Sequence, residues 1–280
     1  MLPQKVEQRL HQRKEEYESR SHTHAPVEIT VRLSSPIMAP VFPLYLDAVL
    51  GNIVAQETWG EYYGRIPTDV FIKELPLPLK KHDLKEYGYA WAASCNVVTK
   101  EAVFGFDGFQ RTYPGDPWVL LKSFTPSQLV DYEGSGRYKN YLEPFEIASI
   151  EEIKFYAVGD PKEINRLLAQ VKFLFKKRSQ GRGEIRSFSV NPIKQDFTLW
   201  RNNRPMRPIP VGLIKEGGHN QYELNMTRLQ PPYWKPDEKV LCIVPDHELW
   251  SGRRIRKPEA KKPKKVTGKK KPNSYNLLYD

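Results

Sequence analysis

The chain has 280 residues, of which 39% are hydrophobic and 12% aromatic. That is more aromatic side chain than a disordered chain carries, and it suffices for one sizeable core. No run of about eighteen apolar residues occurs, so we expect no membrane span, and the N-terminus lacks the apolar segment of a signal peptide. The two cysteines, Cys95 and Cys242, lack zinc spacing, which indicates reduced thiols in a cytoplasmic protein.

The formal net charge of +11 is concentrated at the C-terminus. Between Arg253 and Lys271, eleven Lys or Arg stand against Glu259, so this stretch alone carries +10 and the rest of the chain is nearly neutral. Within that remainder, residues 162–186 hold eight basic residues against two acidic ones. This local patch indicates a polyanion-binding surface better than the overall charge does.

The first half of the chain alternates between strand and helix patterns. Residues 1–26 are polar and of mixed charge, which predicts a marginal helix or a disordered arm. The next segment predicts a strand because its apolar residues occupy every second position; they are Val27, Ile29, Val31 and Leu33. Helical spacing of apolar residues predicts an amphipathic helix from Leu44 to about Thr58. Tyr87–Val98 is a second strand candidate, and the Gly, Pro and aromatic content of about 99–145 predicts an inserted lobe of hairpins and loops.

The same pattern returns in the second half. Alternation over Ile153–Val158 predicts a strand. A helix is predicted to begin at Asp160, a natural N-cap followed by Pro, and its apolar face extends to Phe175. Gly181 marks the end of this helix, and Glu184–Val190 follows as a final strand.

This element order predicts an α+β fold with a ferredoxin-like (RRM-like) βαββαβ core, an inserted thumb-like lobe and a short C-terminal extension. The predicted domains are a polar charged N-terminal arm at 1–26, a ferredoxin-like domain at 27–198 with its insertion at about 99–145, a Pro-rich extension packing on the core at 199–252, and a basic tail, expected to be disordered, at 253–280.

The loop Lys176–Gly183 is the first candidate site. Its glycines allow the backbone to approach a phosphate and expose N–H groups, while its Lys and Arg side chains supply positive charge. It is not a P-loop, because it lacks the Gly-Lys-Ser/Thr ending and follows a helix instead of opening one. The alternative is an ordinary glycine-capped helix end with solvated basic residues.

Three further clusters carry weaker signals. Basic residues interleave with tyrosines in Gly134–Tyr141, as in surfaces that pair with phosphates and stack on bases, but the segment taken alone slightly favours a Gly-rich hairpin turn with exposed side chains. Phe104–Phe109 lacks the RRM signature, which favours core packing or an insertion hairpin. His82, with Lys80, Lys81 and Tyr87 nearby in sequence, offers the residue types for metal-independent RNA cleavage. No histidine has metal-ligand spacing, so we predict no metal, no cofactor and no catalytic residue.

Taken together, these stretches resemble the RAMP superfamily of CRISPR-associated proteins, and within it the handle-binding subunit of type IV effector complexes. The resemblance covers about residues 27–250 and depends on the order and spacing of its pieces. They are Ile29–Pro36 with Leu44–Leu50, Leu75–Leu79, Ala92–Ser94, Gly136–Tyr141, Lys154–Asp160, Lys177–Gly183, Arg204–Pro210, Pro231–Trp234 and Leu241–Pro245.

The resemblance implies a noncatalytic RNA-binding subunit that holds the 5′ handle of a CRISPR guide RNA (crRNA). Such a subunit caps a ribonucleoprotein complex used in antiviral defence against foreign DNA, and contacts its large and backbone subunits in the prokaryotic cytoplasm. From the resemblance and the charge pattern, the predicted RNA-binding residues are Lys176, Lys177, Arg178, Gln180, Gly181, Arg182, Gly183, Arg137, Tyr138 and Lys139. Two alternatives stay open: a metal-independent endoribonuclease that processes CRISPR repeat RNA, and a protein-binding structural adaptor.

Overall fold

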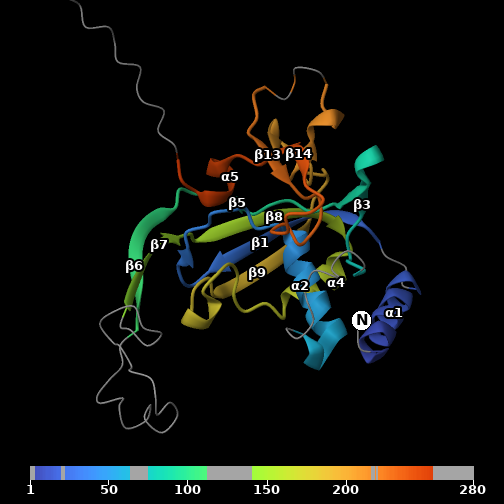
Figure 1. Ribbon diagram of the computed structural model, residues 1–280, viewed down its shortest axis with the longest axis horizontal. Helices are drawn as coiled ribbons and strands as arrows, with labels where there is room; N and C mark the ends of the chain where they lie inside the picture. The colour runs from blue at the N-terminus through green and yellow to red at the C-terminus, as the bar shows by residue number, and fades with distance from the viewer. Residues whose placement is uncertain are drawn as a thin grey trace, which may run out of the picture.

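A four-stranded antiparallel sheet forms the centre of the protein (Figure 1). The computed structural model describes residues 4–19, 23–63, 75–111, 141–215, 218 and 220–254. The strand order in the sheet is β5-β8-β1-β9. The strands are β1 (Ala25–Leu33), β5 (Val97–Val98), β8 (Glu152–Gly159) and β9 (Ile185–Pro192).

One face of this sheet carries the main core. Ile29 of β1 lies opposite Phe155 of β8 and Val190 of β9, so three apolar side chains line one row across the sheet. Helices α2 (Leu46–Trp59) and α4 (Pro161–Leu168) cover this face. The predicted first strand and first helix are confirmed. The helix α1 (Gln4–Ser19) packs against α2, which resolves the choice between helix and disorder for these residues.

The second helix is shorter than predicted. Asp160 caps it as expected, and its carboxylate accepts hydrogen bonds from the amides of Lys162 at 3.0 Å and Glu163 at 3.4 Å. The helix nevertheless ends at Leu168. Phe175 has a φ of 66°, in the left-handed region that a helix interior excludes. The prediction that the helix extends to the basic loop is therefore wrong.

The predicted strand Tyr87–Val98 is two short strands. β4 (Tyr89–Trp91) pairs with β3 (Lys81–Asp83), while β5 joins the main sheet. Between them, the backbone of residues 92–96 bonds to several different segments, among them β8, Leu44 and Met206, so no continuous ladder forms. The buried Asn96 accepts from the Leu44 amide at 2.8 Å and donates to the Trp250 carbonyl at 2.7 Å.

The predicted insertion contains a long hairpin. Its strands are β6 (Val103–Arg111) and β7 (Tyr141–Ser149), with the short strand β2 (Ile37–Met38) paired to β7. This pairing confirms Phe104–Phe109 as part of an insertion hairpin. The predicted RNA-binding residues Arg137, Tyr138 and Lys139 lie outside the described residues.

The C-terminal extension consists of short elements. They are β10 (Trp200–Arg201), β11 (Arg204–Pro205), β12 (Ile209–Pro210), β13 (Leu224–Thr227), β14 (Val240–Ile243) and α5 (His247–Ser251). The 3-10 turns are η1 (Gly60–Tyr62), η3 (Lys85–Tyr87), η4 (Arg178–Gln180) and η5 (Val211–Leu213). The fold is thus mixed α and β with several antiparallel sheets. No described helix is long and apolar enough to span a membrane.

Candidate nucleic-acid interface

The basic loop at residues 174–183 is held in one conformation by its ends. The Leu174 amide donates to the Gly183 carbonyl at 2.8 Å, and the Gly183 amide donates to the Pro36 carbonyl at 3.0 Å. The hydroxyl of Ser35 donates to the Gly181 carbonyl at 2.7 Å. The loop is therefore a pre-formed feature fixed to the chain segment that follows β1.

Gly181 and Gly183 are under different steric constraints. Both have a positive φ, 73° at Gly181 and 71° at Gly183, which side chains disfavour. A Cβ at Gly183 would also overlap the Leu174 carbonyl oxygen, whereas a Cβ at Gly181 would meet nothing within 4 Å. Gly183 therefore closes the base of the loop, and Gly181 forms its turn.

The backbone amides of residues 180–183 are bonded within the protein and are not offered to a phosphate. The amides of Gln180 and Gly181 donate to the carbonyls of Lys177 and Arg178, both at 3.0 Å, within the 3-10 turn η4. The Gly183 amide is bonded as described above. The expectation that these glycines expose N–H groups is therefore wrong, and any RNA contact from this part of the loop must come from side chains.

Two of the four loop cations are paired with the β6–β7 hairpin. Arg182 forms an ion pair with Asp107 of β6. Lys177 lies 3.8 Å from Glu143 of β7, and its ammonium stands over the ring of Phe145 at 5.5 Å from the centroid. These contacts fasten the loop to the hairpin and partly neutralise its charge.

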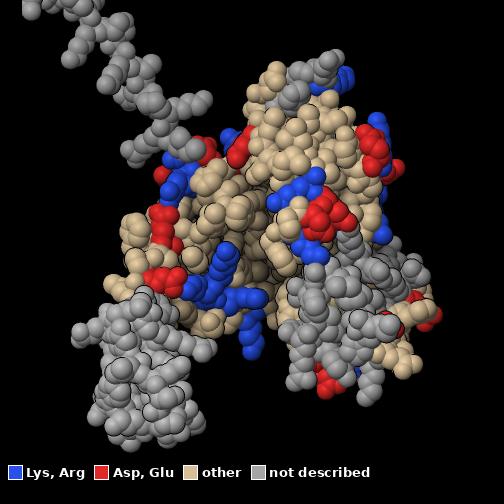
Figure 2. Space-filling model, viewed as in Figure 1, with Lys and Arg blue, Asp and Glu red and all other residues tan. Residues whose placement is uncertain are grey.

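The other two cations point to solvent. Lys176 and Arg178 are exposed and form no ion pair with any described residue. Gln180 is exposed beside them. Figure 2 shows a group of Lys and Arg side chains over the part of the surface where β9 and this loop lie in Figure 1. Of the four loop cations, Lys176 and Arg178 are thus available to a ligand, whereas Lys177 and Arg182 are engaged by acids of the hairpin.

Sequence reasoning missed the acids that compete for the loop. Asp107 lies 75 residues before Arg182 in the sequence and Glu143 lies 34 residues before Lys177, but strand pairing in the hairpin places both acids beside the loop. Their positions on one face follow from the hairpin register, in which Asp107 lies opposite Phe145 and Phe109 opposite Glu143. A period-2 reading of β6 alone would have placed Asp107 and Phe109 on the same face.

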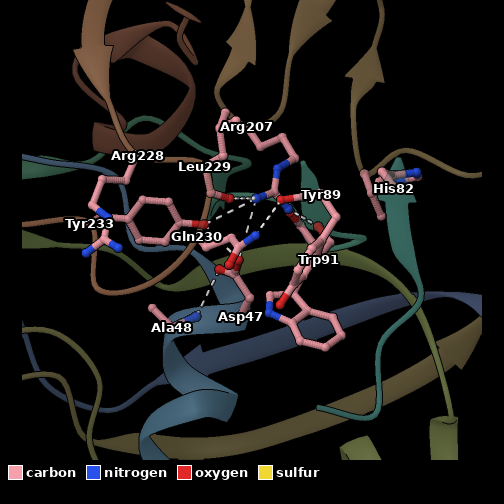
Figure 3. Close-up of polar contacts among 12 residues, drawn as sticks. Asp47, Ala48, His82, Tyr89, Trp91, Arg207, Arg228, Leu229, Gln230 and Tyr233 are labelled. Carbon is pink, nitrogen blue, oxygen red and sulfur yellow. Dashed lines mark hydrogen bonds and ion pairs between the residues drawn. The ribbon is translucent and has the colours of Figure 1, made fainter. Parts of the chain in front are cut away.

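A second polar cluster is buried between α2 and the C-terminal extension (Figure 3). Asp47 and Arg207 are both fully buried, with Arg207 Nη2 at 3.6 Å from Asp47 Oδ2. The Tyr233 hydroxyl donates to Asp47 Oδ2 at 2.7 Å. Arg207 also donates to the carbonyls of Trp91, Ala93 and Leu229. Burial raises the pKa of the Asp47 carboxyl, and the charge of Arg207 opposes that shift. Since the side chains of Asp47 and Arg207 are fully buried, we assign this pair a structural role in joining α2 to the C-terminal extension.

His82 is bonded inside the protein. Its Nε2 lies 2.7 Å from Thr198 Oγ1, and the Thr198 hydroxyl donates to Asp196 Oδ1 at 2.6 Å. Because the Thr198 hydroxyl already donates its hydrogen bond to Asp196, the hydrogen bond between His82 and Thr198 must be donated by His82 Nε2. Burial lowers the pKa of His82, against an opposing effect of the Asp196 charge.

This lowered pKa predicts acid sensitivity. The folded state disfavours protonated His82, so its contribution to stability is complete above the unfolded pKa of about 6.5 and is lost as the pH falls toward the folded pKa. We expect the free energy of unfolding to fall more between about pH 7.5 and pH 5 in the wild type than in His82→Gln. Urea titrations at each pH measure it, and equal pH dependence in the two proteins would contradict this assignment.

The described residues bring no group of three His, Cys, Asp or Glu side chains to a position where a metal ion would be held. The thiols of Cys95 and Cys242 are buried, and burial raises the pKa of the Cys242 thiol to about 12. Burial raises the pKa of the Cys95 thiol as well, so both cysteines are protonated near neutral pH in this structure.

Comparison with known proteins identifies a family for part of the chain. Residues 122–245, somewhat less than half of the chain, match the family described as CRISPR type IV associated protein Csf3. This match confirms the resemblance to a type IV CRISPR subunit and includes β8, α4, the basic loop and β9. No curated protein matches by sequence.

A solved structure is also similar at a low level. A chain of a structure titled "Cryo-EM structure of the Type III-B Cmr-beta bound to cognate target RNA" matches with 14% identity and a TM-score of 0.31, covering 69% of this chain and 68% of that chain. This likeness is too low to assign a shared fold.

Proposed function

We propose that this chain, whose residues 122–245 match the type IV CRISPR-associated Csf3 family, holds the 5′ handle of a CRISPR guide RNA without cleaving it. In this proposal it caps an effector complex that acts on foreign DNA, next to the large and backbone subunits. The observation that carries the proposal is the pre-formed loop with Lys176 and Arg178 open to solvent. Guanidinium and ammonium groups bind phosphates, and because the loop is already folded, binding does not incur the entropy cost of ordering it.

The strand order supports a ferredoxin-like core for this subunit. The four strands of the main sheet and the two helices on it occur along the chain in the order β1, α2, β5, β8, α4 and β9, which is βαββαβ, with the other strands inserted between them. The sheet order β5-β8-β1-β9 is that of the ferredoxin-like motif. In this arrangement the loop between α4 and β9 and the hairpin β6–β7 lie together, which the Arg182–Asp107 ion pair supports. The RNA would lie along the outer side of the loop, where Lys176 and Arg178 are exposed.

The surroundings of His82 support binding without catalysis. A general base needs a ring nitrogen within hydrogen-bond reach of the 2′-hydroxyl, but His82 Nε2 is bonded to Thr198 and the side chain is only 16% exposed. The ammonium of the neighbouring Lys81 stands over the Tyr89 ring, 4.3 Å from its centroid. We therefore expect no RNA cleavage from this pair.

One experiment separates the three candidate functions. The purified full chain is incubated with labelled CRISPR repeat RNA in the absence of metal. We expect full-length bound RNA, with affinity that falls as salt rises. Cleavage that is lost in His82→Ala would establish the ribonuclease instead, and absence of RNA binding at moderate salt would leave the adaptor.

A further inference from the structure

A groove lies beside the basic loop, between residues 171–173 and strand β9. Its volume is about 470 Å³, within the range of about 300–1,000 Å³ usual for small-ligand sites. β9 is an edge strand of the sheet. Residues 172–174 pair only with its beginning, and no described strand pairs with this edge beyond that point. The two walls of the groove are residues 171–173 and residues 184–188, and the basic loop at 174–183 connects them.

The groove is lined by aromatic rings. Phe188 lies opposite Val31 in the sheet and packs against the main core, so its ring is fixed from behind. Phe173 forms an isolated bridge with Glu184 across the groove. Both rings are partly exposed, and Val171 adds a further apolar surface. Partly exposed rings of this kind are platforms on which a nucleobase can stack.

The rim of the groove carries positive charge. Lys172 and Arg186 line it, and both are exposed. The one carboxylate among the lining residues is Glu184, whose Oε2 accepts a hydrogen bond from the Ser34 hydroxyl at 2.8 Å. That bond directs the carboxylate toward the segment after β1. Two cations beside aromatic rings match a nucleotide, which has an anionic phosphate next to an aromatic base.

We propose that this groove binds one unpaired nucleotide of the RNA, with its base stacked on Phe173 and its flanking phosphates held by Lys172 and Arg186. This inference rests on the proposed RNA-binding function, and it extends the RNA path from Lys176 and Arg178 along the edge of β9. The contact is made by stacking, so it accepts any base.

The test measures binding of labelled single-stranded RNA to the full chain at several salt concentrations. We expect Phe173→Leu to weaken binding about tenfold, because base–aromatic stacking is lost, and Phe173→Trp to keep wild-type affinity. The salt dependence of binding stays unchanged in Phe173→Leu, since no phosphate contact is lost. The double variant Lys172→Gln with Arg186→Gln, at two exposed positions, is expected to lower the slope of log K against log salt by about 1.4.

The outcomes separate the groove from the proposed function. The groove proposal would be refuted if Phe173→Leu bound RNA with wild-type affinity, or if the double variant kept the wild-type salt slope. In either case, RNA binding by the wild type would still support the proposed function. If Phe173→Leu does not fold, which its melting curve would show, the double variant decides alone. If the wild type binds no RNA, both proposals fall.

Discussion

Replacing Arg207 with methionine is expected to lower the free energy of unfolding by about 3–5 kcal/mol, because it leaves an unpaired carboxylate in the core. Asp47 is fully buried and loses its one cation in this variant. Three backbone carbonyls, those of Trp91, Ala93 and Leu229, each lose a hydrogen bond from the guanidinium as well. Because these groups join α2, the segment after β4 and the C-terminal extension, we expect the extension to detach first. Urea denaturation measures the loss.

Two further variants test the cause. Arg204→Met removes the cation of an exposed pair with Asp246, 3.4 Å apart, and is expected to cost at most about 1 kcal/mol. Adding Asp47→Asn to Arg207→Met removes the uncompensated charge and should recover about 1–2 kcal/mol. If Arg207→Met is as stable as Arg204→Met, the buried pair does not hold the extension on the core.

Gly183→Ala is expected to destabilise the protein by about 2–5 kcal/mol and to weaken RNA binding in parallel. A left-handed backbone costs a non-glycine residue about 1–2 kcal/mol, and overpacking against the Leu174 carbonyl adds about 1–3 kcal/mol. Since Gly183 closes the base of the loop, the overlap would displace Lys176 and Arg178. Thermal melting and RNA titration of the same samples measure both effects.

Gly181→Ala is the matched control for this prediction. Its φ of 73° is nearly the same, but an added Cβ meets no atom within 4 Å. We expect a cost of only about 1–2 kcal/mol and RNA affinity close to that of the wild type. Equal effects of the two substitutions would show that backbone conformation alone, and not closure of the loop, explains the role of Gly183.

The fold could be predicted where a local pattern decides the structure. Alternation in β1 and the cap at Asp160 involve neighbouring residues, and both are found as expected. The end of α4 at Leu168 was missed because apolar spacing continues past it to Phe175. What ends the helix is pairing of residues 172–174 with 183–185 across the loop, a contact between positions that no helical pattern contains.

The position of the candidate site could be predicted from the sequence, but which of its cations are free of ion pairs could not. Charge density and glycine content indicated the loop from sequence. Sequence could not show that Arg182 and Lys177 face acids of the β6–β7 hairpin, because that depends on tertiary packing between distant segments. The same packing leaves Lys176 and Arg178 as the open pair and places Phe173 beside β9.

The measurement that tests the account most directly is the affinity for repeat RNA of the double variant Lys176→Gln with Arg178→Gln, across a range of salt. The control, Lys194→Gln with Lys215→Gln, removes the same charge at two exposed positions outside the loop. We predict that the loop variant binds more weakly, with a salt slope lower by about 1.4, while the control keeps the wild-type slope. Unchanged affinity in the loop variant, or an equal loss in the control, would contradict the claim that this loop holds the guide RNA.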